Sequence, residues 1–401
     1  MTADTLWCPT RIVAGRGAAD ALLRDLPGGD RALVVADAAL EARVDRFRPR
    51  DVLLVTGADL ATVGRVVDRL RSAEPPVIVA FGGGSVIDAV KIAAAAGAGG
   101  LTGLTRSIDR GGVRTRRPLR VGAPMVVAVP TTIGTASEVS PVACVTTPTG
   151  HRLVVGDDLR PSVAVLDPDE LETLPERMVA EGALEAFLRV AGAAASGSLS
   201  ARMQDEAVDL GRRILDAGDS AVLDGAPAAR GRLALLSAET RYSWTAHPRD
   251  PFALRHWYPA NELAYAASLG KIAATLVVLP RLWCLLLQGD RRLGSAEALQ
   301  HFWRAVRPQS RLSADEDVLA LAVRWRVPAP PAPDAAVLRR AADATLDTWT
   351  GPRSALAGWD RRLVGAVLGE EPASGQDPAE RRADVGRAHA RPLPETAEVR
   401  R

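Results

Sequence analysis

Short apolar runs alternate with amphipathic segments over the first 170 residues of the chain. The runs that predict strands are 33–36, 52–55, 76–80 and 125–129. Between the second and third runs, apolar residues at helical spacing predict a helix over 59–73, and another helix is predicted over 85–95. Because continuous apolar runs are typical of strands buried on both faces, this pattern predicts a parallel sheet covered by helices.

The strand pattern stops after Pro175. Residues 176–368 are rich in alanine and leucine at helical spacing, and seven of the eight tryptophans lie beyond residue 240. Beyond residue 370 the chain becomes polar, charged and proline-bearing, which is typical of disorder. We therefore predict an α/β domain over 1–170, an all-α domain over 171–370 and a disordered tail over 371–401.

Composition narrows the function classes. The 401 residues are 47% hydrophobic with a formal net charge of +2, which excludes whole-chain disorder and gives no field for nucleic-acid binding. The three cysteines lie far apart, which excludes a disulfide framework and favours a reducing compartment. Residues 1–15 do not have the pattern of a signal peptide, and the apolar stretch 272–287 is broken by Pro280 and Arg281. We expect a cytoplasmic protein with no membrane partner.

The basic residues are almost all arginine. Of 50 basic residues only Lys91 and Lys271 are lysines. Where arginine is the default cation, a retained lysine is informative, although chance survival explains either one equally well.

Two loops carry the chemistry. The turn 82–85, Gly-Gly-Gly-Ser, follows a predicted strand and opens a predicted helix, so its backbone can approach a phosphate at the helix N-terminus. A tight strand-to-helix turn with no ligand is the alternative. The segment 130–139 follows another strand and gathers hydroxyl side chains and a glycine, which suit a phosphate, a ribose or an amide edge.

These segments resemble the iron-containing alcohol dehydrogenase family, within the dehydroquinate synthase-like superfamily. The matching stretches are 82–91 (family form GGGSxxDxAK), 130–138 (PTTxGTxSE), 161–175 and the opening 9–17. The resemblance implies an N-terminal dinucleotide-binding α/β domain and an all-α C-terminal domain, with the active site in the cleft between them. It also implies NAD(P) as the hydride carrier.

The resemblance assigns cofactor-binding residues one by one. It implies that Gly83, Gly84 and Ser85 hold the pyrophosphate, with Asp88 in the same motif. It implies that Thr131, Thr132 and Thr135 line the nicotinamide side and that Arg152 stands near the cofactor where the family has a lysine. Asp37, which ends the first predicted strand, would meet the adenosine ribose. Its carboxylate disfavours a 2′-phosphate, so NAD is expected ahead of NADP.

The chain departs from the family at the metal site. The family holds its metal on one aspartate and three histidines, and the corresponding positions here are Gly182, Ala186, Leu263 and Lys271. A further histidine of the family, credited with proton relay, corresponds to Ala267. We therefore expect no metal. The alternative is a rearranged site that uses His247, His256 or Glu262.

Lys271 is the candidate replacement for the ion. Its ammonium could place a positive charge near the substrate oxygen, or a desolvated neutral amine could take the hydroxyl proton. Tyr265 is the second candidate catalytic residue, and Glu185 is a further proton carrier. The alternative is that Lys271 is an exposed residue at a loop end.

The leading hypothesis is a metal-independent NAD(P)-dependent dehydrogenase acting on an alcohol, with a small-molecule or peptide substrate. A refinement is a β-hydroxy acid whose oxidation product loses CO2, as in modifying a peptide C-terminal threonine in a biosynthetic pathway. Arg241, Arg249 and Arg255 could bind its carboxylate, or could be solvated surface residues. A retired NAD-binding partner or regulatory subunit, and a lyase or cyclase like dehydroquinate synthase, are the other readings. A homodimer is left open.

Overall fold

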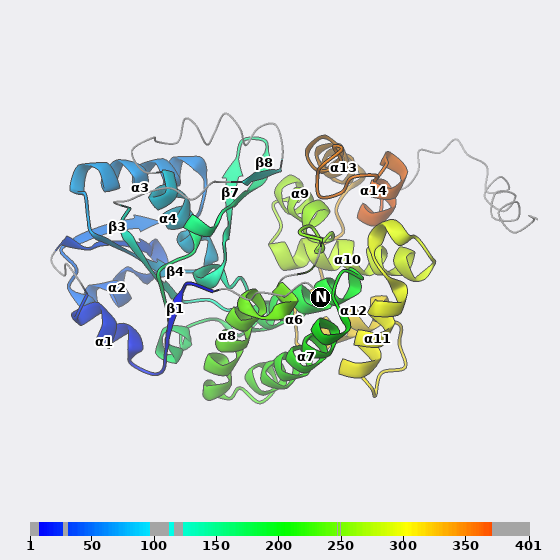
Figure 1. The fold of residues 1–401 in the computed structure, drawn as a ribbon, viewed down its shortest axis with the longest axis horizontal. Helices are drawn as coiled ribbons and strands as arrows, with labels where there is room; N and C mark the ends of the chain where they lie inside the picture. Colours follow the sequence, from blue (N-terminus) through cyan, green and yellow to red (C-terminus); the bar gives the residue numbers. More distant parts are fainter. Residues whose placement is uncertain are drawn as a thin grey trace, which may run out of the picture.

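A computed structural model describes residues 8–26, 31–96, 112–115, 123–246, 248 and 250–370. A sheet and its covering helices form one end of the molecule, and a bundle of helices forms the other (Figure 1). The fold class predicted from the sequence is confirmed. The segment predicted to be a disordered tail, 371–401, lies outside the described residues.

The α/β part is built on a six-stranded parallel sheet of order β1-β9-β6-β4-β2-β3. Its strands are β1 (Arg11–Ala14), β2 (Leu33–Asp37), β3 (Asp51–Val55), β4 (Val77–Gly82), β6 (Met125–Pro130) and β9 (Val163–Leu166). The four apolar runs of the sequence thus form β2, β3, β4 and β6.

Alternate residues of each central strand enter two different cores. Leu33 and Val35 pack with α3 (Leu60–Ala73) and α4 (Gly84–Ala96) on one face. Val34 and its neighbours pack with α1 (Ala18–Arg24) and α2 (Glu41–Val44) on the other. Both faces are therefore buried, which explains why these strands read as continuous apolar runs.

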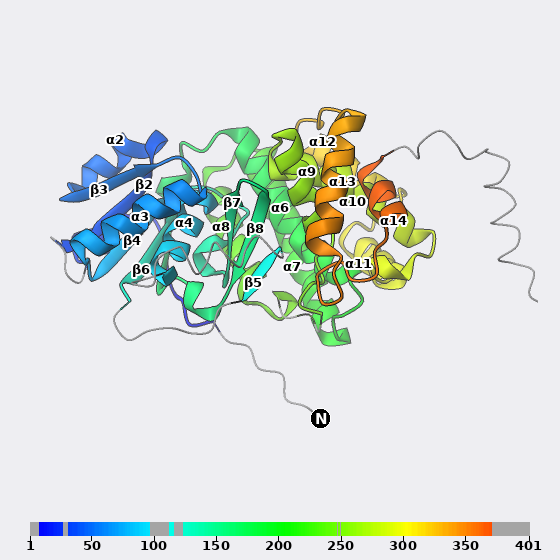
Figure 2. The ribbon, with the colours of Figure 1, turned by 90° about the horizontal axis from the view of Figure 1, so that it is seen from above.

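A smaller sheet was not predicted. It contains β5 (Val113–Thr115), β7 (Val142–Thr147) and β8 (Gly150–Val155), with β7 and β8 antiparallel. The hairpin β7–β8 stands between α4 and α9 (Trp257–Ala267), as Figures 1 and 2 show. Buried and partly exposed positions alternate along β7 and β8, on both sides of the turn at Thr149-Gly150, as expected for strands with one face in the core.

The rest of the described chain is helical. The helices are α6 (Glu176–Ala195), α7 (Ala201–Val222), α8 (Pro227–Tyr242), α9, α10 (Lys271–Leu287), α11 (Ala296–Val306), α12 (Ala314–Arg324), α13 (Ala335–Trp349) and α14 (Arg361–Leu368). Serine or aspartate caps open several of them. Asp334 accepts from Val337 N (2.7 Å) and Asp360 accepts from Leu363 N (2.8 Å).

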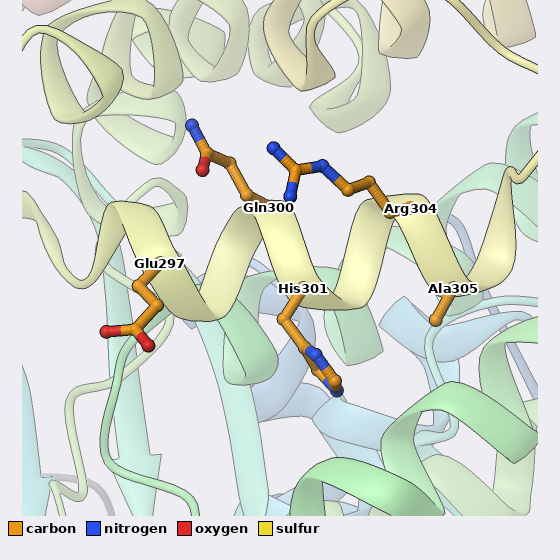
Figure 3. A pocket seen from close by; sticks show the side chains of 5 residues that line it. All are labelled: Glu297, Gln300, His301, Arg304 and Ala305. Carbon is orange, nitrogen blue, oxygen red and sulfur yellow. The ribbon is translucent and has the colours of Figure 1, made fainter.

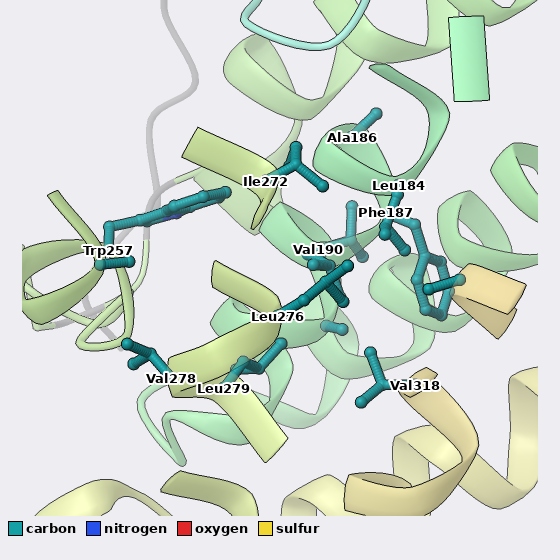
Figure 4. Close-up of a cluster of buried hydrophobic side chains, with 14 of the residues drawn as sticks. Leu184, Ala186, Phe187, Val190, Trp257, Ile272, Leu276, Val278, Leu279 and Val318 are labelled. Atoms are coloured by element: carbon teal, nitrogen blue, oxygen red, sulfur yellow. The ribbon is translucent and has the colours of Figure 1, made fainter. Parts of the chain in front are cut away.

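Helix α6 is the central element of the helical part. Phe187 and Val190 on α6 pack with Leu276 and Leu279 of α10 in one continuous apolar core (Figure 4). Because this core fixes the axis of α6, it also fixes where the few polar side chains of α6 emerge. No helix among the described residues is long and apolar enough to cross a membrane.

Candidate functional site

The two predicted loops lie against each other at the carboxyl ends of neighbouring strands. A Cβ atom on Gly84 would lie 2.6 Å from Thr135 Oγ1, and one on Gly83 would lie 3.2 Å from Thr132 Cγ2. Thr131 N donates to Gly82 O (3.1 Å). Glycine is therefore required at 84, because any side chain there would push the loops apart, whereas a side chain at 83 would need only a small shift of Thr132.

The start of α4 offers an anion site. The first intrahelical hydrogen bond runs from Ile87 N to Gly83 O (3.2 Å), so the amide groups of residues 84–86 precede it. Ser85 is exposed at this end. Asp37 ends the adjacent strand β2, where its carboxylate accepts from Ala39 N (3.0 Å). This arrangement fits the pyrophosphate and ribose of a dinucleotide.

Asp88 and Lys91 of helix α4 hold the second loop, 130–139, in place through hydrogen bonds. Asp88 accepts from Ser137 Oγ and from Cys144 N (2.8 Å). Lys91 is buried and donates to Asp88 (3.3 Å), Ser137 O (3.1 Å) and Val142 O (2.6 Å). Burial lowers the pKa of Lys91, and Asp88 opposes this. One of the two lysines is thus a structural anchor.

The predicted ligand positions carry no carboxylate or imidazole that could bind a metal. A Cβ on Gly182 would lie 2.5 Å from Ile133 O, so the backbone of the 131–135 loop fills the place of an aspartate side chain. Ala186 and Leu263 are completely buried in the helical core. Over the described parts of the chain, no three His, Cys, Asp or Glu side chains form a group that could hold a metal ion. These residues do not fit the iron of the resembled family.

Lys271, at the first turn of α10, lies beside the same face of α6. Its Nζ donates to Glu185 Oε1 (3.2 Å) and lies 4.3 Å from the centre of the Trp257 ring. Residues 182, 185, 186 and 189 share one face of α6 because they are three or four positions apart. Lys271 therefore meets α6 where the resemblance puts two metal ligands.

Glu185 and Arg189 form a buried pair that ties α6 to the loop. Arg189 donates to Glu185 Oε1 (3.3 Å), Gly134 O (2.6 Å) and Thr240 Oγ1 (2.8 Å). Although burial alone would raise the pKa of Glu185, the charges of Lys271 and Arg189 bring it below its ordinary value. Glu185 is thus a carboxylate that orients the Lys271 ammonium.

His256 is a neutral neighbour of this cluster. Its ring lies tilted by 42° against that of Trp257, with the ring centres 4.5 Å apart, and its buried Nε2 has no hydrogen-bond partner in the part of the chain that the structure describes. Burial, with the nearby charges of Lys271 and Arg189, lowers the pKa of His256 to about 3. His247, the other histidine proposed for a rearranged metal site, lies outside the described residues.

Arg152, Glu262 and Tyr265 are engaged elsewhere. The Arg152 guanidinium is buried and donates to Glu262 Oε1 (3.0 Å) and Thr149 O (2.9 Å). Glu262 also accepts from Trp349 Nε1 (2.8 Å), so these contacts fasten β8 to α9 and α13. Tyr265 donates its hydroxyl proton to Pro148 O (2.7 Å) in the hairpin turn. Within the described part of the chain, none of these three side chains forms a hydrogen bond or ion pair with Lys271.

The three arginines proposed for a carboxylate differ. Arg255 is paired with Asp250 (2.7 Å), and Arg249 lies outside the described residues. Arg241, in the last turn of α8, is partly buried and its Nε has no partner. Burial and the neighbouring Arg189 lower the pKa of Arg241 to about 9.

Sequence reasoning missed Arg189 and Glu138. Arg189 had a signal, because Glu185 and Arg189 are the charged residues of an otherwise apolar stretch, 183–195, at pair spacing. Glu138 belongs to the second motif and is buried, with the charges of Lys91, Arg189 and Arg241 acting on it. Burial raises its pKa to about 7 against the opposing cations.

A surface hollow of about 480 Å³ lies elsewhere, along α11. Its lining residues are Glu297, Gln300, His301, Arg304 and Ala305, all from one helix (Figure 3). None of them belongs to the motifs, so we do not assign this hollow to the site.

Comparison with known proteins gives the same picture. The sequence profile of the family described as "Iron-containing alcohol dehydrogenase" matches residues 9–168. The chain is 37% identical over 204 residues to phosphonoacetaldehyde reductase of Streptomyces viridochromogenes, covering 48% of this chain and 50% of that protein. It is 29% identical over 212 residues to the NADPH-dependent aldehyde reductase YqhD of Escherichia coli, covering 50% and 54%. These matches span about half the length of either relative.

Similarity of the fold extends over the whole chain. The structure of NADH-dependent butanol dehydrogenase A of Thermotoga maritima has a TM-score of 0.77 at 18% identity, covering 93% of this chain and 99% of that one. The structure of YqhD has a TM-score of 0.74 at 21% identity, covering 92% and 98%. The resemblance seen in the sequence is thereby confirmed: residues 9–168 match the family's profile, and the fold is similar to that of solved iron-containing alcohol dehydrogenases.

Proposed function

We propose that this relative of the iron-containing alcohol dehydrogenases is an NAD(P)-dependent oxidoreductase that interconverts an alcohol and a carbonyl compound without a metal ion. One observation carries the proposal. The Lys271–Glu185 pair lies on the α6 face where metal ligands are expected, next to loops that retain the form of a dinucleotide site.

Different groups of the chain would bind different parts of the dinucleotide. The amides of 84–86 and Ser85 would hold the pyrophosphate, Thr132 and Thr135 would line the nicotinamide side, and Asp37 would meet the ribose. We expect NAD ahead of NADP because Asp37 presents a carboxylate there. NAD(P)H, when bound by these residues, would supply the hydride.

Lys271 supplies the charge and the proton. In the reducing direction the carbonyl carbon gains a hydride and the carbonyl oxygen gains a proton, which Lys271 Nζ donates. The ammonium stabilises the negative charge that develops on this oxygen, as a metal ion would. Glu185 and the Trp257 ring hold Nζ in position. The Lys271 side chain is 43% exposed, so water can return the proton to the amine.

A β-hydroxy acid is the alcohol that makes the smallest demand on such a site. Its oxidation gives a β-keto acid, which loses CO2 readily and so draws the reaction forward without a metal. A tailoring step in a biosynthetic pathway, for example on a peptide C-terminal threonine, has this chemistry.

The test uses one purified sample of the full chain. Metal content is measured by elemental analysis, NADH and NADPH binding by fluorescence titration, and turnover on aldehydes and alcohols before and after a chelator. We expect dinucleotide binding and turnover that the chelator does not change. Stoichiometric zinc or iron with activity lost on chelation would refute metal independence. Dinucleotide binding with no turnover on any substrate would favour the retired binding partner.

A further inference from the structure

Arg241 forms no ion pair with any residue that the structure describes. Among the described residues it takes part in no hydrogen bond or ion pair, whereas Arg255 is paired with Asp250 and Arg189 with Glu185. Its Nε is shielded from solvent and unpartnered. A partly buried guanidinium in this condition is costly to the fold, so its retention calls for a ligand that is absent from the free chain.

Arg241 lies on the face of α8 that contacts the second loop, 130–139. Ser237, Thr240 and Arg241 share one face of α8, because they are three and four positions apart. Ser237 Oγ accepts from Gly134 N (3.2 Å), and Thr240 Oγ1 accepts from Arg189. The face of α8 that carries Arg241 is therefore the face that contacts the nicotinamide-side loop.

The charges around Arg241 leave an excess of positive charge. Its electrostatic neighbours are Arg189, Glu185, Asp88 and Glu138. Asp88 is already paired with Lys91, and Glu185 is shared by Arg189 and Lys271. The remaining carboxyl group is Glu138, whose pKa is raised to about 7 by burial. The four cations Arg189, Arg241, Lys91 and Lys271 outnumber the three carboxyl groups, so a bound anion would reduce the excess of positive charge.

We infer that Arg241 binds a carboxylate or phosphonate group of the substrate, so that the enzyme acts on small acidic aldehydes or alcohols. This inference rests on the proposed function. A guanidinium suits such anions because it can donate two parallel hydrogen bonds to them.

A phosphate of the dinucleotide is the other source of the same chemistry. The geometry favours the substrate, because the amides that suit a pyrophosphate lie at 84–86 whereas Arg241 interacts with Asp88 and with Glu138 on the 3₁₀ turn η5 (Ser137–Val139). Glu185, which orients Lys271, is also among its neighbours. Arg241 and Lys271 would thus hold the two ends of one short substrate.

Equilibrium binding tests the inference without turnover. Glutarate and methylphosphonate are titrated calorimetrically into the full chain saturated with NADH or NADPH, whichever binds, and the affinity for that dinucleotide is measured alone. We expect Arg241→Gln to weaken both anions more than tenfold, Arg241→Lys to weaken them less, and the dinucleotide affinity to stay within twofold. Arg232→Gln, an exposed arginine on the same helix, is the matched control and should change nothing.

Two results would overturn the inference. One is a wild-type chain that binds neither anion, or binds them as tightly after Arg241→Gln. The other is a dinucleotide affinity that falls as far as the anion affinity, which would assign Arg241 to the cofactor. Failure of the proposed function is a separate result. It would appear as absent turnover on 4-oxobutanoate and butanal alike, whereas the inference predicts that Arg241→Gln raises KM for 4-oxobutanoate and not for butanal.

Discussion

Gly134 and Gly182 face each other where the 131–135 loop meets helix α6. A Cβ on Gly134 would lie 2.8 Å from Gly182 Cα, and Gly134 has a φ of +110° that side chains rarely adopt. The loop and the helix therefore approach as closely as backbones can. This contact occupies the position at which the resembled family places its metal-binding aspartate.

Restoring that aspartate should damage the protein rather than create a metal site. Gly182→Asp would set a Cβ 2.5 Å from Ile133 O, and backbone cannot give way cheaply. We expect a loss of about 1–3 kcal/mol of unfolding free energy and weaker NADH binding, with no gain in zinc or iron. Chemical denaturation and elemental analysis measure these effects. Gly57→Asp, at a glycine with open space around it, should be neutral. A stable Gly182→Asp protein that binds metal would contradict the packing argument.

Removing the Lys271 ammonium should separate catalysis from stability. For Lys271→Met we expect kcat to fall about 100-fold or more, because the substrate oxygen loses its proton donor and charge. The Lys271 side chain is 43% exposed and Glu185 keeps Arg189 as a partner, so the change in unfolding free energy should stay within about 1 kcal/mol. NADH affinity should be unchanged. Unaltered kcat in Lys271→Met would remove Lys271 from the mechanism.

An acidic residue at the start of α4 should have opposite effects on folding and on binding. Ser85→Asp places a negative charge at a helix N-terminus, which stabilises the helix by about 0.3–1 kcal/mol. The same charge repels a pyrophosphate, so we expect NADH affinity to fall at least tenfold. Thermal melting and fluorescence titration give the two readouts. Ser85→Asn, the neutral variant of similar shape, should bind NADH nearly as well as the wild type, and equal affinities for all three proteins would place the phosphates elsewhere.

Glu138 should make the stability depend on pH near neutrality. Its pKa is about 7 in the folded chain and near 4.5 when unfolded, so between these values the folded state holds a proton that the unfolded state has released. The contribution of Glu138 therefore favours folding at pH 4.5 and is lost as the pH rises to about 7.

Glu138→Gln keeps the neutral side chain at every pH. We expect its stability relative to wild type to increase between pH 5 and pH 7 and then to level off, as measured by denaturant unfolding at pH 5, 6, 7 and 8. A difference that is the same at pH 5 and pH 8 would show that Glu138 does not titrate in this range.

The sequence by itself determined the layered α/β part and the two loops that we propose bind the cofactor. Apolar runs such as 77–80 predict strands of a parallel sheet, because a strand that is buried on both faces needs apolar residues at consecutive positions. The glycines of 82–84 permit close approach of the backbone, and the threonines of 131–135 supply hydroxyl groups, so the residue types alone indicate what these loops can do. The missing ligands at Gly182 and Ala186 were also visible there, since neither residue has a side chain that can bind a metal.

Only the tertiary structure decided how the charged residues are used. Lys91 and Lys271 look alike in the sequence, yet one is an internal anchor and the other lies beside Glu185 and Trp257. Arg241 and Arg255 also differ, because Arg255 is paired with Asp250 whereas Arg241 has no ion-pair partner among the described residues. The contacts of Lys91 with Val142 and of Lys271 with Glu185 join residues 51 and 86 positions apart, and there burial and pairing set the energy of a charge. Such contacts leave no periodic trace along the chain.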